Sequence, residues 1–272
     1  MLTTEHKREF HRNGFLILHD AIDADVISRA RDIVWGSIPE TPDKPEEWSH
    51  DNQSLYSDDL KDQAPFRELN DIASAYVAEF LGEDNMTYAG DANLQVALRF
   101  PDEQTIYDPT APQISDVHSH VDGTLDISDG QGDLVPHTIN TAIYLDRVQP
   151  YGGGFTAWPG SHLDVCRFLE EHPLPEVKGG IPAPDGEGGW QEGVSRDEVF
   201  DPVEVIGGPG TITIWHGRLE HEGGINLSPG TVRMAAIKRF FHEKAWEFQE
   251  EAPGDPYRGW DGMDDIRPTP TP

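Results

Sequence analysis

The spacing of apolar residues changes once along the chain, near residue 87. Before that point, apolar residues recur every three or four positions, which predicts helices that bury one face. Beyond it, short segments alternate apolar and polar residues, as half-buried β-strands do. The sequence therefore predicts an N-terminal helical layer followed by a sheet-rich body.

Local signals mark the ends of the N-terminal elements. Thr3 or Thr4 can cap a first helix and Gly14 can end it, while Asp23 or Asp25 can cap a second helix. The predicted elements are a helix over Glu5–Arg12, a strand over Phe15–Leu18, a helix that ends near Gly36, a polar loop over 37–63 and a helix over Pro65–Leu81.

Short strands follow, separated by glycine- and proline-rich turns and without helices between them. Such a pattern favours a double-sheet all-β architecture. We expect residues 163–200 to form an acidic surface insertion or lid and residues 247–272 a loosely packed tail, all within a single domain over 1–272. The predicted strands are Asn93–Phe100, Ile114–Val121, Ile139–Asp146, Gly154–Trp158, Val203–Ile206, Thr211–Trp215 and Thr231–Phe241.

The chain is strongly acidic, with 50 Asp and Glu residues against 20 Lys and Arg and a net charge of −30. This charge repels nucleic acid and anionic membranes, so we exclude both as partners. No run of 18 apolar residues and no signal pattern is present, so we expect a cytoplasmic protein. The single cysteine, Cys166, excludes an intrachain disulfide and is interpreted as a packed core residue.

The acidic residues are spread along the chain rather than gathered in one tail. We hypothesise a halophilic host, in which high internal salt screens the repulsion between them. The unfolding midpoint should then be higher in molar salt than in low salt. Equal midpoints would identify an ordinary acidic protein.

Candidate metal ligands lie in the stretch Asp116–Gly123. His120 and Asp122 are two positions apart, so in an extended strand both side chains point to one face and can bind one divalent metal. A third ligand is available from the stretch Trp215–Asn226, where His221 opens a glycine-rich turn. His118 and His216 are the alternatives to His120 and His221. Two histidines and one carboxylate that leave open positions are typical of non-haem iron(II) oxygenases.

Arg233 lies on the last predicted strand. If its side chain points inward, the buried guanidinium needs a carboxylate partner. That partner is either a bound ligand or one of the many Asp and Glu residues of the chain, and on the strand pattern alone the second is the simpler interpretation.

Taken together, these segments resemble the phytanoyl-CoA dioxygenase family of iron(II)/2-oxoglutarate-dependent oxygenases over roughly residues 8–245. The segments that carry the resemblance are Phe10–Leu18, His120-Val-Asp122-Gly, Ala142–Asp146, the glycine-rich run Gly152–His162, Gly210–His221 with the Gly-Gly-Ile-Asn226 turn, and Arg233.

The resemblance implies a double-stranded β-helix, or jelly roll, in which His120, Asp122 and His221 bind Fe(II). It implies that Arg233 holds the distal carboxylate of 2-oxoglutarate, that Arg99 adds a polar contact to this cosubstrate, and that Thr156 lies on the strand facing the metal. With O2, such an enzyme hydroxylates a C–H bond of a small-molecule or lipid-like substrate and releases succinate and CO2. Because Asp122 is a carboxylate, we expect hydroxylation rather than halogenation.

Two other classes of protein are compatible with the same set of residues. One is a jelly-roll hydrolase or isomerase with zinc or manganese at the three ligands, and the other is a non-catalytic jelly-roll binding module. Pro159-Gly-Ser-His162 is interpreted as a structural corner, because no further triad member accompanies it. No basic cluster suited to a CoA phosphate is evident, and nothing in the sequence specifies an oligomeric state.

Overall fold

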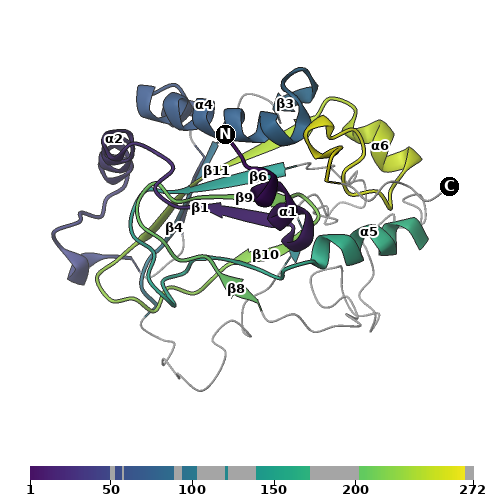
Figure 1. The fold of residues 1–272 in the computed structure, drawn as a ribbon. Coiled ribbons are helices and arrows are strands. Elements are labelled where there is room, and N and C mark those ends of the chain that lie inside the picture. The colour runs from purple at the N-terminus through teal and green to yellow at the C-terminus, as the bar shows by residue number, and fades with distance from the viewer. Residues whose placement is uncertain are drawn as a thin grey trace, which may run out of the picture.

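The computed structural model describes residues 1–49, 53–56, 58–88, 94–102, 120–121, 139–171 and 202–266. Two antiparallel sheets face each other, and helices cover the outer face of the larger one (Figure 1). The predicted class, mainly β with flanking helices, is confirmed. Across the described ranges, no helix has both the length and the apolar character needed to cross a membrane.

The N-terminal helices form where their local signals predict. Helix α1 (Thr4–Asn13) is capped by Thr3, whose hydroxyl accepts from the backbone N–H of His6, and it ends at Gly14 with φ 79°. Helix α2 (Ala24–Gly36) is capped by Asp23. Helix α4 (Ala64–Leu81) ends at Gly82. Each of these helix ends carries either a short polar side chain that accepts a terminal backbone N–H or a glycine that ends the helix.

The major sheet has seven strands and is built around the long strand β11 (Arg233–His242). Strand β3 (Met86–Tyr88) pairs with the far end of β11. The other strands lie on either side of β11. On one side, moving outward, are β6 (Ile139–Tyr144), β9 (Ile212–His216) and β1 (Phe15–Leu18), and on the other side are β4 (Leu94–Arg99) and β2 (Gln53–Tyr56).

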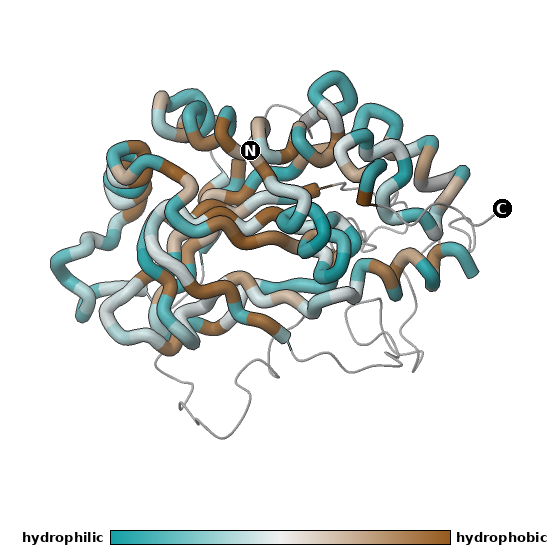
Figure 2. The backbone as a smooth tube through the Cα atoms, in the orientation of Figure 1, coloured by the Kyte–Doolittle hydropathy of each residue, from teal (hydrophilic) through white to brown (hydrophobic). Residues whose placement is uncertain are grey.

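The two faces of the major sheet bury different cores, because successive side chains of a strand point to opposite faces. On β11, Met234 and Ala236 join the core beneath the helices, whereas Ala235 joins the core between the sheets. Figure 2 shows the hydrophobic positions concentrated in the central strands and the hydrophilic ones on the outer loops and helix surfaces.

The minor sheet has four strands, β5 (His120–Val121), β10 (Glu220–Gly223), β7 (Phe155–Ala157) and β8 (Val203–Glu204), in that spatial order. Strand β10 was predicted as a turn because of its glycines. It is a strand because it pairs with β5 on one side and β7 on the other. Of the predicted strand Ile114–Val121, only its last two residues are described.

The prediction of a polar loop over 37–63 is wrong for part of the described segment. The segment contains a 3-10 turn (Pro45–Glu47), strand β2 and helix α3 (Asp58–Lys61). Strand β2 is polar and only half-buried, and it forms because β4 offers it an edge. A strand held by the edge of a neighbour gives little periodic signal in its own sequence.

The acidic insertion predicted over 163–200 begins with helix α5 (Ser161–Glu171), and residues 172–200 lie outside the described ranges. The interpretation of Pro159–His162 as a structural corner is supported. The Ser161 hydroxyl accepts from the Glu220 backbone N–H at 2.9 Å, and His162 Nε2 lies 2.9 Å from the Tyr257 hydroxyl. Cys166 is buried and free, as expected.

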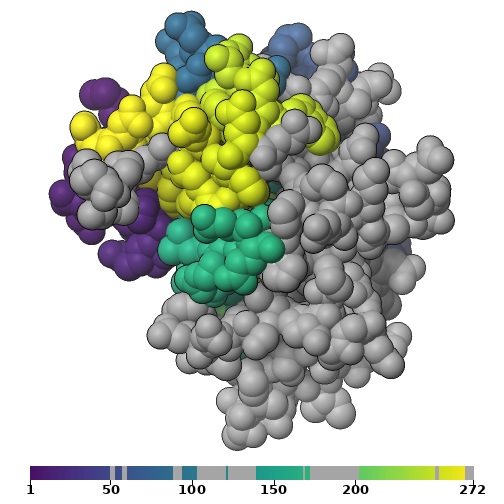
Figure 3. All heavy atoms as spheres, turned by 90° about the vertical axis from the view of Figure 1, so that its right-hand side faces the viewer, coloured from purple at the N-terminus to yellow at the C-terminus, as the bar shows by residue number. Residues whose placement is uncertain are grey.

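The prediction of a loosely packed tail over 247–272 is wrong for its central part. After helix α6 (Ala245–Glu251), the side chains of Tyr257, Trp260 and Met263 are buried. The rings of Tyr257 and Trp260 lie 6.3 and 6.0 Å from that of Phe10 in α1. Figure 3 shows this C-terminal segment lying against α5. The segment is held by its aromatic residues. Its proline and acidic content led the sequence analysis to predict a loose tail.

Three buried histidines hold this segment, and they predict a loss of stability in mild acid. His216 Nε2 donates to the Pro256 carbonyl at 2.7 Å, while its Nδ1 accepts from the Arg218 N–H, so the ring is neutral. Burial lowers the pKa of His216 to about 3, and it also lowers the pKa of His162 and of His242, which contacts the Gly259 carbonyl.

In the unfolded chain these imidazoles take up protons near their ordinary pKa of about 6.5. Above pH 6.5 they make their full contribution to the free energy of unfolding. This contribution is lost as pH falls toward 3, by about 1.4 kcal/mol per pH unit for His216. Between pH 7.5 and pH 5, measured in high salt, the unfolding midpoint of His216→Gln should fall by less than that of the native chain. Equal drops would contradict this assignment.

Candidate active site between the two sheets

A cavity of about 280 Å³ lies between the two sheets. Its floor carries small residues from the major sheet, Ala97, Ala142 and Ala235, which leave space that larger side chains would fill. The other lining residues are the aromatic, charged or polar residues Tyr56, Gln95, Arg99, Tyr144, Phe155, Trp215, His221, Glu222, Arg233 and Arg239, together with Gly223 and Ile237.

Strand β10 places His221 in this cavity. The imidazole is 5 % exposed and packs against the rings of Phe155 and Trp215 at 5.2 and 5.3 Å between centroids. Its Nδ1 lies 2.8 Å from the Leu219 carbonyl, which can only accept, so Nδ1 carries the proton. The lone pair is then on Nε2, the arrangement in which a metal-binding histidine is usually held.

The backbone of His120 lies directly across from His221. The two residues are register partners in the antiparallel pair β5–β10. Side chains at such paired positions are near neighbours on one face of a sheet. The structure thus brings these two segments together across 100 residues of sequence. The side chain of His120, together with His118 and Asp122, lies outside what the structure describes, so the metal triad stays a prediction.

His216, the alternative to His221, is not part of the cavity. Its ring stacks on Trp260 at 5.2 Å and bonds to the C-terminal segment. It therefore has a structural role, while His221 lines the cavity. In the sequence the two differ only in local context, because His216 follows the apolar residue Trp215 whereas His221 precedes a glycine-rich turn.

Arg233 opens β11 and points into the cavity, with 4 % of its surface exposed. Its Nε donates to the Gly153 carbonyl at 2.7 Å and its Nη1 to the Ala97 carbonyl at 3.3 Å. Within the described ranges no carboxylate lies at ion-pair distance from it. Burial first, and then the charge of Arg99, lower the pKa of Arg233 to about 10.

Arg99 is the register partner of Arg233 on β4, so two guanidinium groups lie side by side at one end of the cavity. Burial lowers the pKa of Arg99, while Glu222 opposes that effect. Its Nε is buried with no hydrogen-bond partner in the described part of the chain. Arg233 is buried and Arg99 is half-buried, and among the described residues neither has a carboxylate at ion-pair distance, so the pair is suited to bind an anion.

The glycine-rich turn that follows β6 is shaped to reach Arg233. Gly153 has φ 75°, and a Cβ there would lie 3.2 Å from the Arg99 Cβ. Glu204 fixes the turn by accepting the backbone N–H groups of Tyr151 and Gly154 at 2.7 and 3.0 Å. The carbonyl of Gly153 is thereby held where it accepts from Arg233.

Thr156 differs from expectation. Its hydroxyl donates to the Gly154 carbonyl at 3.4 Å, and it does not line the cavity. Its neighbours Phe155 and Ala157 join the core between the sheets, so Thr156 points to the opposite face of β7. Phe155, the preceding residue on β7, lines the cavity instead, and a cosubstrate role for Thr156 stays a prediction.

Glu222 is a cavity residue that the sequence did not single out. It is 2 % exposed, and both carboxylate oxygens lack a hydrogen-bond partner among the described residues. Burial, and then the nearby Glu220, raise its pKa to about 8, while Arg99 lowers it. Arg239 was also missed, although it shares a strand face with Arg233 and the period-two pattern of β11 could have identified it.

Gly223 gives a sharp steric prediction. A Cβ on this residue would lie 2.6 Å from Arg233 Nη2 and 3.0 Å from Arg99 Nη2. Gly223→Ala should therefore displace the arginine pair and weaken 2-oxoglutarate binding by roughly tenfold or more, through lost charge-assisted hydrogen bonds. Titration of the cosubstrate into metal-loaded protein measures this. Gly208→Ala, where nothing lies within 4 Å of the added carbon, is the control. Unchanged binding in Gly223→Ala would contradict the site.

Two facing antiparallel sheets that enclose a cavity lined by two arginines and a histidine, with helices outside, define a jelly-roll protein. The sequence matches the model of the family described as "Phytanoyl-CoA dioxygenase (PhyH)" over residues 10–235. The chain belongs to this family and is an enzyme of the dioxygenase type.

Solved structures share the fold. The epimerase SnoN, in complex with Fe3+, alpha ketoglutarate and nogalamycin RO, has a TM-score of 0.54 and 18% identity over 88% of this chain and 82% of its own. HygX from Streptomyces hygroscopicus, with nickel and 2-oxoglutarate bound, has a TM-score of 0.53 and 15% identity over 88% and 87%. SnoK, a carbocyclase from nogalamycin biosynthesis, has 0.51 and 19% over 88% and 84%. No functionally curated protein matches the sequence.

Proposed function

We propose that this chain is an Fe(II)- and 2-oxoglutarate-dependent oxygenase that hydroxylates a C–H bond of a small-molecule substrate. The observation that carries the proposal is the pair of buried Arg233 and half-buried Arg99, which lines the same cavity as His221 and has no paired carboxylate among the described residues. A dicarboxylate cosubstrate supplies the anion that this pair needs.

His120, Asp122 and His221 are the proposed metal ligands. The lone pair on His221 Nε2 and the position of His120 on the adjacent strand fit a divalent metal. The spacing of Asp122 from His120 predicts that an oxygen ligand accompanies them. One carboxylate and two imidazoles suit iron(II).

The chain's own residues orient the groups that would bind the metal and the cosubstrate. Arg233 is fixed by the carbonyls of Gly153 and Ala97, so its guanidinium is already oriented when the cosubstrate arrives. Phe155 and Trp215 hold the His221 ring from two sides. When bound, Fe(II) and 2-oxoglutarate supply the oxidation, in which O2 gives one oxygen atom to succinate and one to the product while CO2 leaves.

Product analysis tests the hydroxylation step separately from the cofactor assignment. Hydroxylation adds one oxygen atom to the substrate, ring closure removes two hydrogen atoms, and epimerisation leaves the mass unchanged. An epimerase and a carbocyclase are among the proteins of this fold. Mass analysis of product formed in the presence of O2 therefore decides which outcome this cavity produces.

The decisive experiment combines anaerobic binding with turnover. Purified protein should bind Fe(II), bind 2-oxoglutarate more tightly with Arg233 intact than in Arg233→Met, and release succinate only when O2 is admitted. A jelly-roll hydrolase or isomerase would convert its substrate without consuming 2-oxoglutarate. A binding module would retain no metal. Either result, obtained with folded protein, would refute the proposal.

A further inference from the structure

Glu204 is a half-buried carboxylate on β8, beside the cavity but not part of its lining. Its backbone is held by β7, where Thr156 is its register partner. The next residue, Val205, accepts a hydrogen bond from the Tyr144 hydroxyl at 2.8 Å and donates one to the Phe155 carbonyl at 2.7 Å. Glu204 is therefore fixed next to two residues of the cavity wall.

The glycine-rich turn adopts a strained backbone that this carboxylate stabilises. Tyr151 has φ 59°, a left-handed conformation that is costly for a residue with a side chain, and Gly153 has φ 75°. Glu204 accepts the backbone N–H of Tyr151 at 2.7 Å and that of Gly154 at 3.0 Å. A Cβ on Gly154 would lie 2.9 Å from the Glu204 Cγ, so glycine at this position lets the carboxylate approach.

One peptide group connects the Glu204 carboxylate to the Arg233 guanidinium. The N–H of Gly154 donates to Glu204, and the carbonyl of Gly153, which belongs to the same peptide group, accepts from Arg233 Nε at 2.7 Å. The negative charge thus lies at the positive end of the peptide dipole, and the positive charge lies at its negative end. Hydrogen bonds in such a chain polarise one another, and bonds to charged groups are the stronger kind.

The charges of the two side chains stabilise each other across this peptide group. Burial first, and then the charge of Arg99, lower the pKa of Arg233 to about 10, and the charge of Glu204 opposes this effect. Burial raises the pKa of Glu204, while backbone N–H groups of the turn and the charge of Arg233 oppose that rise. A buried guanidinium needs a counter-charge, and Glu204 provides one without a direct ion pair.

The indirect contact leaves the guanidinium available to a ligand. Within the described part of the chain, Arg233 donates through Nε and Nη1 to two carbonyl groups, and Nη2 is left for another acceptor. A carboxylate side chain in direct contact would instead occupy the paired N–H groups that an incoming carboxylate needs.

We propose that Glu204 is a positioning residue for cosubstrate binding, which acts on Arg233 through the peptide group between Gly153 and Gly154. Its carboxylate fixes the direction of the guanidinium and supplies a counter-charge that does not compete with the bound anion. The identity of that anion, 2-oxoglutarate, rests on the proposed function, whereas the connection between Glu204 and Arg233 does not.

The Nε–H of Arg233 tests this connection without any cosubstrate. In 15N-labelled protein, its resonance is the arginine Nε–H signal that is absent from Arg233→Met. Glu204→Gln keeps the shape of the side chain, removes its charge and leaves one N–H of the turn facing an amide NH2 group. The Arg233 Nε–H resonance should therefore shift, and the proton should exchange with solvent at least about threefold faster, because its acceptor is less polarised and less firmly held.

Affinity for 2-oxoglutarate then measures the effect on the proposed site. In protein loaded anaerobically with Fe(II), Glu204→Gln should weaken 2-oxoglutarate binding about three- to tenfold and leave Fe(II) affinity unchanged. The turnover rate at saturating 2-oxoglutarate should change less than the concentration required. In the Arg233→Met background, the same substitution should change binding by less than about twofold, because the group on which Glu204 acts is absent.

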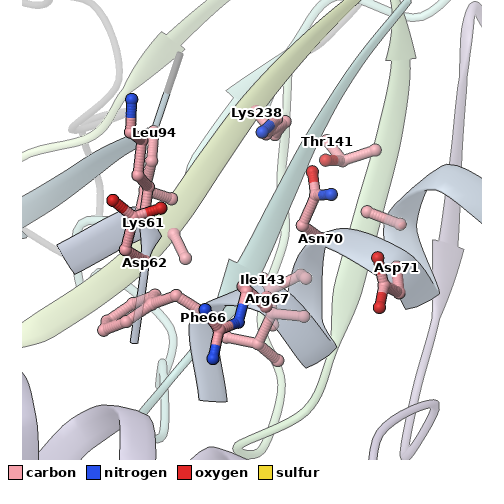
Figure 4. Close-up of a pocket in the computed structure, with 13 residues that line it drawn as sticks. Lys61, Asp62, Phe66, Arg67, Asn70, Asp71, Leu94, Thr141, Ile143 and Lys238 are labelled. Carbon is pink, nitrogen blue, oxygen red and sulfur yellow. The ribbon is translucent and has the colours of Figure 1, made fainter. Parts of the chain in front are cut away.

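Two carboxylates elsewhere are matched controls. Glu79 in α4 also accepts a backbone N–H, that of Leu2 at 2.7 Å, so Glu79→Gln removes the same kind of contact away from the cavity. Asp71→Asn removes one negative charge on the opposite face of the major sheet, where Asp71 lines the pocket between α4 and the sheet that Figure 4 shows. Neither should change the Arg233 resonance or 2-oxoglutarate binding. Glu204→Asp, which keeps the charge on a shorter side chain, should lose less affinity than Glu204→Gln.

The outcomes separate this role from the proposed function. A shifted Arg233 resonance and weaker 2-oxoglutarate binding in Glu204→Gln, with both controls unchanged, support the role of Glu204. An unchanged resonance in folded Glu204→Gln, or an equal loss of affinity with and without Arg233, overturns it. If the native protein binds no 2-oxoglutarate but the resonance still responds to Glu204→Gln, the proposed function is refuted and Glu204 remains the residue that positions Arg233.

Discussion

His221→Ala should abolish metal-dependent turnover and reduce Fe(II) affinity by on the order of a hundredfold or more. Loss of a metal ligand weakens metal binding more than loss of a group that only orients the ligand. The side chain lines the cavity and packs against the rings of Phe155 and Trp215, with its proton on Nδ1. Metal content of protein loaded anaerobically, followed by succinate release after O2 is admitted, measures both effects.

Removal of a buried imidazole also costs stability, so the fold must be checked independently. We expect His221→Ala to unfold cooperatively with a midpoint lowered by a loss of about 1–3 kcal/mol. His19→Ala is the matched control, since His19 is exposed and does not line the cavity. If His221→Ala retains iron and activity, the third ligand lies elsewhere and the proposed metal site is wrong.

Arg233→Met should raise the 2-oxoglutarate concentration needed for turnover by roughly tenfold to a hundredfold, the range expected for lost hydrogen bonds to a charged group. The native guanidinium is held by the carbonyls of Gly153 and Ala97, so its orientation is set before the cosubstrate binds. Methionine fills similar space without the charge. Arg233→Lys should fall between the two, because an ammonium cannot make the paired contacts of a guanidinium.

Arg239 provides a matched control for this experiment. It lies on the same strand and lines the same cavity, but six positions further along β11. Arg239→Met should leave 2-oxoglutarate binding to metal-loaded protein unchanged, because Arg233 and Arg99 are intact. Equal losses in Arg233→Met and Arg239→Met would show that general positive charge, rather than the arginine pair, attracts the cosubstrate.

The two ends of the cavity between the sheets are built differently. His221 and the arginine pair lie on strands held by sheet pairing, while the other end of the cavity is lined by Tyr56, Gln95 and Arg239. We expect substitutions at that end to alter substrate selection without disturbing cosubstrate binding. We therefore expect substrate selection in this chain to depend on β2, on the ends of β4 and β11, and on the loops around them.

The sequence by itself determined the local structure. The Thr3 cap and the Gly14 stop of α1, the Asp23 cap of α2 and the Gly82 end of α4 depend on residues within one turn of each helix end. The change from helical to alternating spacing determined the class of fold. Both patterns involve only residues close together in the sequence, so they can be recognised without knowing which distant residues pack against them.

Only the tertiary structure decided which distant residues meet. Strand pairing placed Arg99 beside Arg233 and His120 opposite His221, and it turned Thr156 away from the cavity. In the same way, contacts with α1 bury the C-terminal aromatics. Register and packing depend on segments a hundred or more residues apart, and no local pattern encodes that information.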